Sequence, residues 1–381
     1  MLIAMNAIIR CEHCQLNVTV PKLEHRQRAI CPRCGHQLTA HRRGSVQSSL
    51  AFSLSGLIFL VLSLGFDFLS FKASGQQNTI NLIQGLITLS NGGYVGLALI
   101  TGLATLILPG SVLVCIGVLQ VNRLLVSPNR FSGRTFIWIK RLMPWSMAEI
   151  FLVGTLVSLI KITSLADVVL GMSFYAYVLF TVCYAFTLLY FDREETQRWL
   201  DPVQPIIHSP VTQASAAYSV QRTWALLFTA MLLYIPANTL PIMHTNLLGN
   251  NEPSTIISGV KLLWESGSYP VASVIFVASV VVPIAKLIAL AWLNFSVQKQ
   301  HSTNQTGRAL SYRLTEIVGR WSMIDVFVVA ILVALIQLGN TMSIYPGPAV
   351  FAFCAVVFIT MMAAMTFDSR LIWYKSTQHD E

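Results

Sequence analysis

The sequence predicts an all-α polytopic membrane protein in which a four-helix transmembrane module occurs twice, after a small N-terminal domain with paired cysteines. Hydrophobic residues make up 54% of the 381-residue chain and charged residues only 11%. Soluble domains, in contrast, have about a quarter of their residues charged. Apolar runs long enough to cross a bilayer recur along the chain, and the two halves repeat one pattern.

An 18-residue segment gives the clearest evidence of duplication. It reads WSMAEIFLVGTLVSLIKI at 145–162 and WSMIDVFVVAILVALIQL at 321–338, 176 positions later, with nine identical positions. Glu149 of the first copy is matched by Asp325, which chance similarity between two apolar helices does not explain. Further matched landmarks lie outside the segment: Pro109 and Pro283, Gly171 and Gly347, Phe191-Asp192 and Phe367-Asp368.

Eight transmembrane spans are predicted, four in each repeat. They are 50–70, 94–120, 145–165, 172–191, 224–244, 269–293, 321–340 and 348–366. The corresponding domains are an N-terminal domain (1–45), a first module (46–192), a linker (193–221), a second module (222–370) and a tail (371–381). Residues 1–10 lack a basic stretch followed by an apolar core, so no signal peptide is expected.

The net charge of +9 is unevenly distributed. Lysine and arginine gather in the N-terminal arm and in the loops after the second and sixth spans, whereas the opposite loops have few. This asymmetry places both termini and the linker in the cytoplasm. The basicity therefore reflects membrane topology, and no nucleic-acid binding is predicted.

Two CxxC pairs lie in the N-terminal arm, Cys11 with Cys14 and Cys31 with Cys34. Four thiolates at this spacing form a tetrahedral zinc ribbon site, with iron in a rubredoxin-like site as the alternative. Disulfides are disfavoured because cytosolic thiols stay reduced. One structural ion is predicted, because so short a domain buries too little core to fold alone. The histidines of the arm are expected at the surface: His13, His36 and His41.

Charged side chains inside spans indicate where a mechanism could lie, because each costs about 2.5–3.5 kcal/mol to insert. Lys286 follows Pro283 deep in the sixth span, and Asp325 on the next span is its predicted partner. Glu149 is the first-repeat counterpart of Asp325. The alternative is that both carboxylates simply favour their helix N-termini.

Other polar residues are predicted near the outer face. Lys161 and Asp67 are expected to pair there, with Asp167 as a competing partner and snorkelling of Lys161 as the alternative. Asn238 lies in Pro236-Ala-Asn-Thr-Leu-Pro241, which predicts an interrupted helix. Pro109 and Pro283 predict kinks, and the segments 80–87 and 256–264 predict short helices in the interface plane.

The chain has no P-loop, no Gly-x-Ser-x-Gly and no His-Glu-x-x-His motif. These motifs would supply phosphate binding, a nucleophile elbow or a catalytic zinc site. The sequence therefore predicts a protein that is not an enzyme.

The cysteine ribbon, the doubled Trp-Ser-Met-x-(Glu/Asp) helix, the Leu-Val-Ser-Leu-Ile-Lys161 ending and the Pro236–Pro241 segment resemble the paraquat-inducible protein A family. The resemblance implies two four-helix modules in the bacterial inner membrane with cytosolic zinc ribbons. It also implies a periplasmic MCE-domain partner that forms a lipid-conducting tunnel. One departure is visible: the linker 193–221 has no cysteine where the family has a second ribbon. Within the chain, Gln337 stands where the first repeat has Lys161, which suggests that any lysine-dependent step is confined to one module.

The expected function is that of an inner-membrane subunit of an intermembrane lipid-trafficking system. It would pass phospholipid-like molecules between the bilayer and the MCE-domain tunnel. Two alternatives remain: a zinc- or redox-responsive membrane sensor or scaffold, and a proton-coupled exporter of small amphiphiles. A sensor predicts an essential ribbon and dispensable intramembrane charges, whereas an exporter predicts essential charges in a cavity.

Overall fold

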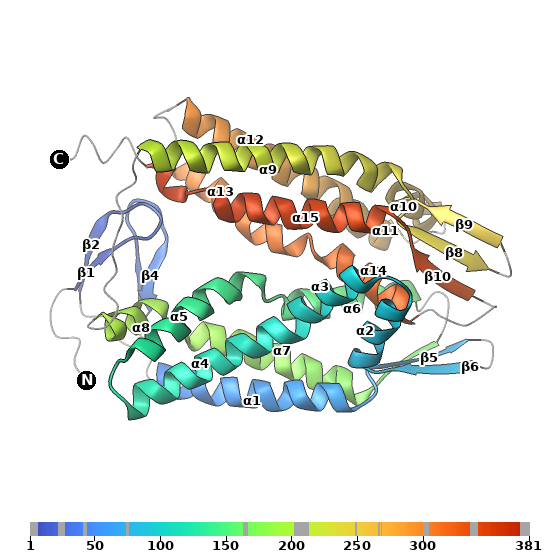
Figure 1. The fold of residues 1–381 in the computed structure, drawn as a ribbon, viewed down its shortest axis with the longest axis horizontal. Helices are drawn as coiled ribbons and strands as arrows, with labels where there is room; N and C mark the ends of the chain where they lie inside the picture. The colour runs from blue at the N-terminus through green and yellow to red at the C-terminus, as the bar shows by residue number, and fades with distance from the viewer. Residues whose placement is uncertain are drawn as a thin grey trace.

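The computed structural model describes residues 7–21, 27–40, 44–73, 76–162, 167–201, 213–247, 250–265, 267, 269–299, 305–335 and 342–373. Long helices run along the main axis of the molecule, and short strands lie at both of its ends (Figure 1). The end that carries residues 7–40 is named the ribbon end. The opposite end is named the sheet end.

Residues 45–200 form module 1. Its elements in chain order are α1 (Ser45–Gly65), β5 (Leu69–Ala73), β6 (Gln76–Ile80), α2 (Leu82–Asn91), α3 (Val95–Gly102), the π-helical turn η1 (Leu103–Ile107), α4 (Leu108–Leu125), α5 (Arg130–Leu142), the 3-10 turn η2 (Met143–Trp145), α6 (Ala148–Ile162), β7 (Asp167–Leu170), α7 (Met172–Tyr190) and α8 (Arg193–Leu200).

Residues 213–373 form module 2. Its elements are α9 (Gln213–Thr239), β8 (Met243–Leu247), β9 (Asn250–Ser254), α10 (Ile256–Glu265), α11 (Tyr269–Phe276), the π-helical turn η3 (Val277–Val281), α12 (Val282–Gln298), α13 (Gln305–Trp321), α14 (Ile324–Leu335), β10 (Met342–Pro346), α15 (Ala349–Thr366) and the 3-10 turn η4 (Ser369–Ile372). The main elements follow the same order as in module 1, which agrees with the predicted duplication.

Six helical segments of the described chain are long and apolar enough to cross a membrane. They are Ser45–Gly65, Val95–Leu125, Arg130–Leu159, Met172–Tyr190, Val277–Gln298 and Ala349–Thr366. The other two predicted spans, 224–244 and 321–340, fall on α9 and on α14, which has 12 residues.

The two prolines predicted to kink their helices lie just after π-helical turns. Pro109 follows η1 and Pro283 follows η3, each as the second residue of the next α-helix. A proline lacks the N–H donor and its ring clashes with the carbonyl four residues earlier, so a wider turn relieves the strain. Pro236 behaves differently: α9 continues through it to Thr239, so the predicted interruption near Asn238 is wrong.

Each module also carries a small antiparallel sheet, which corrects the all-α prediction to a mostly helical fold. The strand orders are β6-β5-β7 and β10-β8-β9. In module 1, Leu69 is paired with both Ile80 and Leu170. The sheet thus joins β5 and β6, which follow the first long helix, to β7, which precedes the last long helix of the module. Strands such as Gln76–Ile80 are too polar to show the alternation that marks a half-buried strand.

Glycine is required where the third strand of each sheet meets the last long helix. A Cβ atom on Gly171 would overlap the carbonyl oxygen of Asp67, and one on Gly347 would overlap that of Pro241. The Gly171 amide donates to Phe68 O at 3.1 Å, and the Gly347 amide donates to Ile242 O at 2.8 Å. The repeated glycines therefore allow the chain to pass directly against the corner after the first helix.

The two modules meet along the duplicated helices α6 and α14. The rings of Phe151 and Phe327 are 5.7 Å apart in an edge-on contact. A Cβ on Gly154 would lie 3.2 Å from the Phe327 Cβ, so the glycine permits this close approach. Both phenylalanines belong to one buried apolar cluster that extends through both modules. The segment that shows the duplication therefore also forms the centre of the structure.

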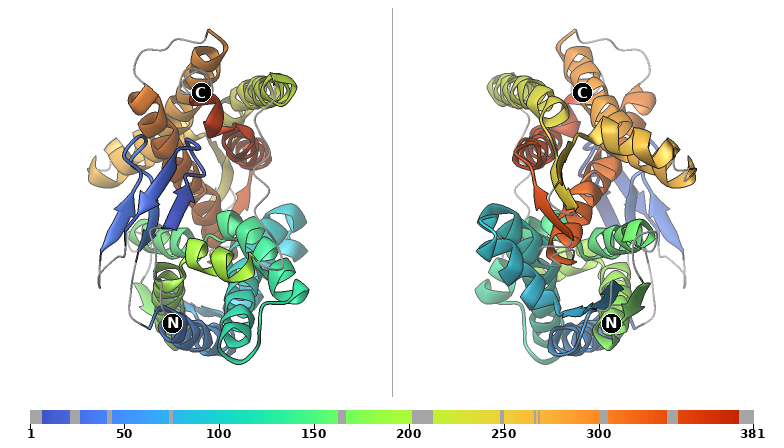
Figure 2. Two further views of the ribbon diagram at one scale, coloured as in Figure 1. Left: turned by 90° about the vertical axis from the view of Figure 1, so that its left-hand side faces the viewer. Right: turned by 90° about the vertical axis from the view of Figure 1, so that its right-hand side faces the viewer.

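The N-terminal domain consists of two hairpins at the ribbon end. Strand β1 (Ala7–Arg10) pairs with β2 (Asn17–Val20), and β3 (Arg28–Ile30) pairs with β4 (Gln37–Ala40). Seen from this end, these strands lie across the ends of the helices (Figure 2). Their apolar residues share a cluster with Tyr312, Phe367 and Trp373 of module 2.

Candidate functional site

The four cysteines of the N-terminal domain converge at one point. Their sulfur atoms all lie within 4.8 Å of one another. Cys11 Sγ is 3.5 Å from Cys34 Sγ, and Cys14 Sγ is 3.4 Å from Cys31 Sγ. Disulfide sulfurs would be about 2.05 Å apart. Tetrahedral zinc with Zn–S bonds of about 2.3 Å separates its sulfurs by about 3.8 Å, close to what is observed.

The environment of the sulfurs also fits a cation. Cys11, Cys14 and Cys31 are each 1% exposed. A hydrogen bond from the Cys14 side chain lowers the pKa of Cys11 to about 4, whereas burial raises the pKa of Cys34 to about 11. A bound cation would favour the ionised form of all four cysteines, because it supplies the positive charge that buried thiolates need. The four cysteines could therefore hold a metal ion such as zinc.

Each CxxC pair sits on the same kind of tight turn. The Gln15 amide donates to Cys11 O at 2.9 Å, and the Gly35 amide donates to Cys31 O at 2.8 Å. Both turn residues are left-handed, with φ of 60° for Gln15 and 66° for Gly35. Glycine adopts this conformation without strain, so Gly35 suits the turn after the last cysteine.

The predicted surface histidines are half-buried beside the cluster. The rings of His13 and His36 are 4.2 Å apart, and His13 Nδ1 is 3.2 Å from Ser369 Oγ. Burial lowers the pKa of His36 to about 4, so its ring is neutral at pH 7. His41 lies outside the described residues.

The ribbon contacts both modules. Arg313 of α13 donates to the backbone oxygens of Cys34 at 2.8 Å and Gly35 at 3.2 Å. On the module 1 side, Lys140 forms a 3.2 Å ion pair with Glu12. Thr39 Oγ1 also donates to Asp192 Oδ2 at 2.9 Å. The N-terminal domain is therefore connected by polar contacts to both modules.

Lys286 is the most deeply buried amine of the described chain. Its side chain is 3% exposed, and Nζ donates to Thr360 Oγ1 of α15 at 3.0 Å. The Thr360 hydroxyl in turn donates to Val357 O. A Cβ on Gly319 would lie 3.1 Å from Nζ, so α13 passes against the ammonium group. Thr360 and Gly319 were not identified from the sequence, because neither has a distinctive pattern around it.

The two matched carboxylates of the repeats, Asp325 and Glu149, have different outcomes. Asp325 is the second residue of α14, but its side chain lies outside the described residues, so the Lys286–Asp325 pair stays a prediction. Glu149 lies in the first turn of α6 and is half-buried. It interacts electrostatically with Arg320 of module 2, a partner that the sequence did not indicate.

Asp67 and Asn238 have partners other than Lys286. Asp67 is exposed after α1, where the Asn81 amide, with its nitrogen toward Asp67, donates to Oδ1 at 2.7 Å. Asn238 donates to Tyr234 O, one turn earlier in α9, at 2.9 Å. Lys161 is in the last turn of α6, but its side chain lies outside the described residues, so its pairing stays untested.

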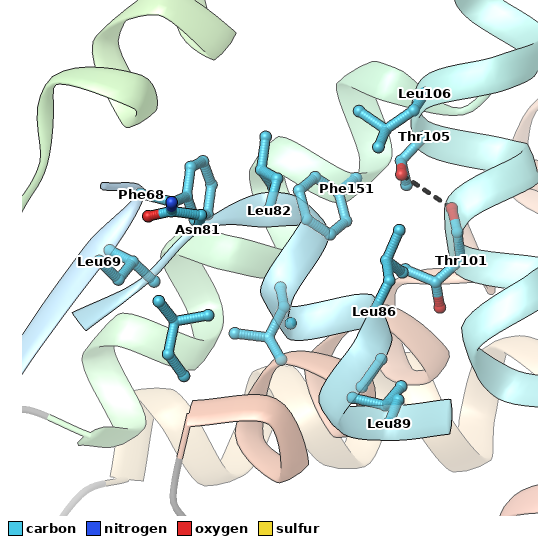
Figure 3. Close-up of a pocket in the computed structure, with 14 residues that line it drawn as sticks. Phe68, Leu69, Asn81, Leu82, Leu86, Leu89, Thr101, Thr105, Leu106 and Phe151 are labelled. Atoms are coloured by element: carbon cyan, nitrogen blue, oxygen red, sulfur yellow. Dashed lines mark hydrogen bonds between the residues drawn. The ribbon is translucent and has the colours of Figure 1, made fainter. Parts of the chain in front are cut away.

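An apolar pocket of about 60 Å³ lies near the sheet end between the modules. Figure 3 shows leucines of α2 facing Phe151 and Thr101, and Ala330 and Ile331 of α14 also line the pocket. Thr105 Oγ1 donates to Thr101 O at 2.8 Å. Thr101 Oγ1 is buried and has no hydrogen-bond partner within the described part of the chain.

Comparison with known proteins identifies relatives over nearly the whole chain. The family described as "Paraquat-inducible protein A" matches residues 46–201 and 220–377, which are the two modules. The chain is 38% identical to the intermembrane transport protein PqiA of Escherichia coli K12, over 98% of this chain and 97% of the relative. No solved structure gives a significant match.

Two more distant relatives have the same extent. A probable intermembrane transport protein of Haemophilus influenzae is 29% identical over 96% of this chain and 95% of its own length. The lipophilic envelope-spanning tunnel protein A of Escherichia coli K12 is 28% identical over 96% of this chain and 90% of its own length. With both modules and almost its full length matched, the chain belongs to the paraquat-inducible protein A family.

Proposed function

We propose that this chain is the inner-membrane subunit of an intermembrane lipid-trafficking system, passing phospholipid-like molecules between the bilayer and a periplasmic MCE-domain tunnel. The observation that carries the proposal is the full-length similarity to proteins named for intermembrane transport and for a lipophilic envelope-spanning tunnel. The shared length matters because it includes both modules and the cysteine-bearing arm. No enzymatic step is part of the proposed function.

The proposed topology has eight spans, with both termini in the cytoplasm. The six long apolar helices support it, together with α9 and α14, which lie alongside them (Figure 1). The basic helices α5 and α13 lie at the ribbon end, and cytoplasmic segments carry the excess of lysine and arginine. The proposed domains are the ribbon (1–45), two membrane modules (46–192 and 222–370), the linker and the tail.

We assign zinc a structural role in the ribbon. Cys11, Cys14, Cys31 and Cys34 would hold one ion, which would join two hairpins that each have little core of their own. When bound, the ion supplies a cross-link and neutralises the thiolate charge. The contacts of Arg313 and Lys140 then connect this stabilised domain to both modules.

The transport-linked polar site is assigned to Lys286, with Asp325 as its proposed partner. An amine buried within a span faces a large desolvation cost, and such residues in membrane proteins usually belong to substrate or ion pathways. Lys286 also lies three residues after Pro283, just beyond a π-helical turn. Such turns are frequent at functional sites.

The proposed function is tested by mild-detergent purification of the tagged protein from its native envelope. We expect an MCE-domain protein and phospholipid to co-purify, and a parallel purification from cells with an untagged copy to yield neither. Deletion of the coding sequence should weaken the outer-membrane barrier. Retention of neither partner nor lipid, with an intact barrier after deletion, would contradict lipid trafficking.

A further inference from the structure

A cavity of about 250 Å³ lies between the two modules toward the ribbon end. Its walls include residues that correspond in the two repeats at the 176-residue offset: Met143 and Gly319, Pro144 and Arg320, Leu188 and Ala364. The cavity therefore sits where equivalent segments of the two modules face each other. Its remaining wall is formed by Phe191, Arg193, Lys286, Met361 and Met365.

Within the described part of the chain, three cations and no acidic residue line this cavity. Lys286 is at the buried end, Arg320 is half-buried, and Arg193 is exposed. Glu149 interacts electrostatically with Arg320, and Glu12 with Arg193. Lys286 Nζ donates to Thr360, and Arg193 contacts Met143 Sδ at 2.5 Å. Neither Glu12 nor Glu149 lines the cavity, and Asp325, the proposed partner of Lys286, would supply one negative charge against three positive ones. A cavity surface with charge of one sign attracts ligands of the opposite sign, so the cavity is suited to an anion.

Two larger cavities adjoin it. One, of about 560 Å³, lies toward the ribbon and shares Leu188, Phe191, Arg193 and Arg320 with the inner cavity. The other, of about 480 Å³, shares Met365 and lies between α5, α9 and α15. Its lining combines basic and aromatic residues, as is typical of a bilayer interface: Lys140, Arg141, Arg222, Trp145 and Tyr218.

We propose that the inner cavity, with Arg193, Lys286 and Arg320, is a binding site for a phosphate group. Guanidinium groups bind phosphate through paired hydrogen bonds, and an ammonium group adds a point charge. The volume of about 250 Å³ is below the 300–1,000 Å³ of pockets for drug-sized ligands, so it suits a headgroup rather than a whole lipid. The methionine, leucine and phenylalanine walls suit the apolar atoms next to such a headgroup.

The phosphate has two possible sources. A phospholipid headgroup would enter through the lateral cavity between α5, α9 and α15, whereas free phosphate would enter through the cavity beneath the ribbon. The lipid source rests on the proposed function, but the anion site itself does not. The site requires a small residue at Gly319, since any larger side chain there would press on the Lys286 ammonium group.

The test is calorimetric titration of the purified, metal-loaded full-length protein in an uncharged detergent. The ligands are short-chain phosphatidic acid, diacylglycerol with the same chains, and inorganic phosphate. We expect phosphatidic acid to bind at least about ten-fold more tightly than diacylglycerol, as one charged hydrogen bond provides. Arg193→Gln and Arg320→Gln should each lower this affinity about ten-fold.

Arg134→Gln is the matched control, because Arg134 is an exposed arginine of α5 that lines none of these cavities. It should bind phosphatidic acid like the wild type. Thermal unfolding checks that each variant is folded. Equal affinity for phosphatidic acid and diacylglycerol, or unchanged affinity in both folded arginine variants, would overturn the proposal.

The third ligand identifies the source. If phosphate competes with phosphatidic acid at equal affinity, the site takes free phosphate; if it competes only weakly, the headgroup is the ligand. Either outcome supports the anion site. If the wild-type protein binds the anion but transfers no lipid in a reconstituted system, the proposed function is contradicted and the anion site stands.

Discussion

The helices α4 and α12 each follow a π-helical turn and have a proline as their second residue. Three residues after this proline, module 1 has Val112 and module 2 has Lys286. Both side chains are buried, Val112 at 0% and Lys286 at 3% exposure. Lys286 is accommodated by Thr360, whereas the residue 176 positions before Thr360 is Tyr184. The two modules thus have one backbone plan, and a few substitutions place the buried cation in module 2 alone. The duplicated backbone is shared by the two modules, whereas the residues at these buried positions differ between them.

The ribbon shows a second asymmetry. It precedes module 1 in the chain, yet its apolar core is completed by Tyr312, Phe367 and Trp373 of module 2. The linker before module 2 has no cysteine, and the ribbon that precedes module 1 packs against the C-terminal part of module 2. The single N-terminal domain with the cysteine cluster therefore contacts both modules.

The largest expected effect comes from removing the metal ligand on which this asymmetry depends. Purified protein should contain about one zinc per chain, and Cys31→Ser should lose it. Structural zinc contributes about 10–16 kcal/mol to such domains, so the ribbon should unfold and the yield of folded protein should fall sharply. Metal content and proteolysis of the N-terminal arm measure both effects.

Cys115→Ser is the control for this prediction, because Cys115 is a half-buried cysteine of α4 outside the cluster. It should keep the metal. A folded, stable Cys31→Ser protein without metal would show that zinc has no structural role.

The next effect tests whether the cation of module 2 is coupled to Asp325. Lys286→Met or Asp325→Leu alone should cost about 3–5 kcal/mol, because each leaves one buried charge unpaired. The double variant should regain folding, since two apolar residues replace the pair, but should remain inactive in lipid transfer. Unfolding and transfer assays on all three variants give the coupling energy.

Two outcomes would change this interpretation. Recovery of transfer as well as folding in the double variant would reduce the pair to a structural salt bridge. Additive effects of the two substitutions would show that the residues do not interact, and Thr360 would then be the relevant partner of Lys286.

A smaller effect should be the same in both modules. Gly171→Ala and Gly347→Ala each place a Cβ against a backbone carbonyl, which cannot move away as a side chain can. Such overpacking costs about 1–3 kcal/mol. Gly65→Ala is the control, because no atom lies within 4 Å of its added Cβ. Equal stability of all three variants in thermal unfolding would show that the corners are not under this constraint.

Sequence reasoning predicted features whose cause is local. The doubled helix, the cysteine cluster and the distorted helices at Pro109 and Pro283 all follow from short segments. The sheets were missed because polar strands such as Gln76–Ile80 form only through pairing with distant segments. The continuous helix through Pro236 was missed because the local penalty of proline is overcome by the surrounding helix.

The candidate site was predicted in part, for a similar reason. Lys286 stood out because it lies within an apolar run. The sequence did not single out Arg193, and it indicated Arg320 only as one of the basic residues of the loop after the sixth span. Nothing in the sequence shows that they share a cavity with Lys286. Such groupings depend on how two modules pack, which no local pattern encodes.

The smallest expected effect concerns α8 and η4, the short helical segments that follow the last long helix of each module. Asp192 caps α8 by accepting from the Glu194 amide at 2.9 Å, and Asp368 caps η4 by accepting from the Arg370 amide at 3.0 Å. The capped residues correspond at the 176-residue offset, yet one is acidic and the other basic. Burial raises the pKa of Glu194 from 4.5 to about 7, and the charge of Glu12 adds to the effect.

The folded state therefore holds the Glu194 proton more tightly than the unfolded state does. The stabilisation is fully present below about pH 4.5 and is lost as the pH rises to about 7. In Glu194→Gln this loss should disappear, so the variant should gain stability relative to the wild type between about pH 5 and about pH 8. Arg370→Gln, the matched change in module 2, should remove the Asp368 ion pair and lower stability similarly at both pH values. Thermal unfolding across this range measures both. Parallel pH profiles for wild type and Glu194→Gln would show that Glu194 ionises normally. The segments α8 and η4 would then differ only in the charge of the capped residue.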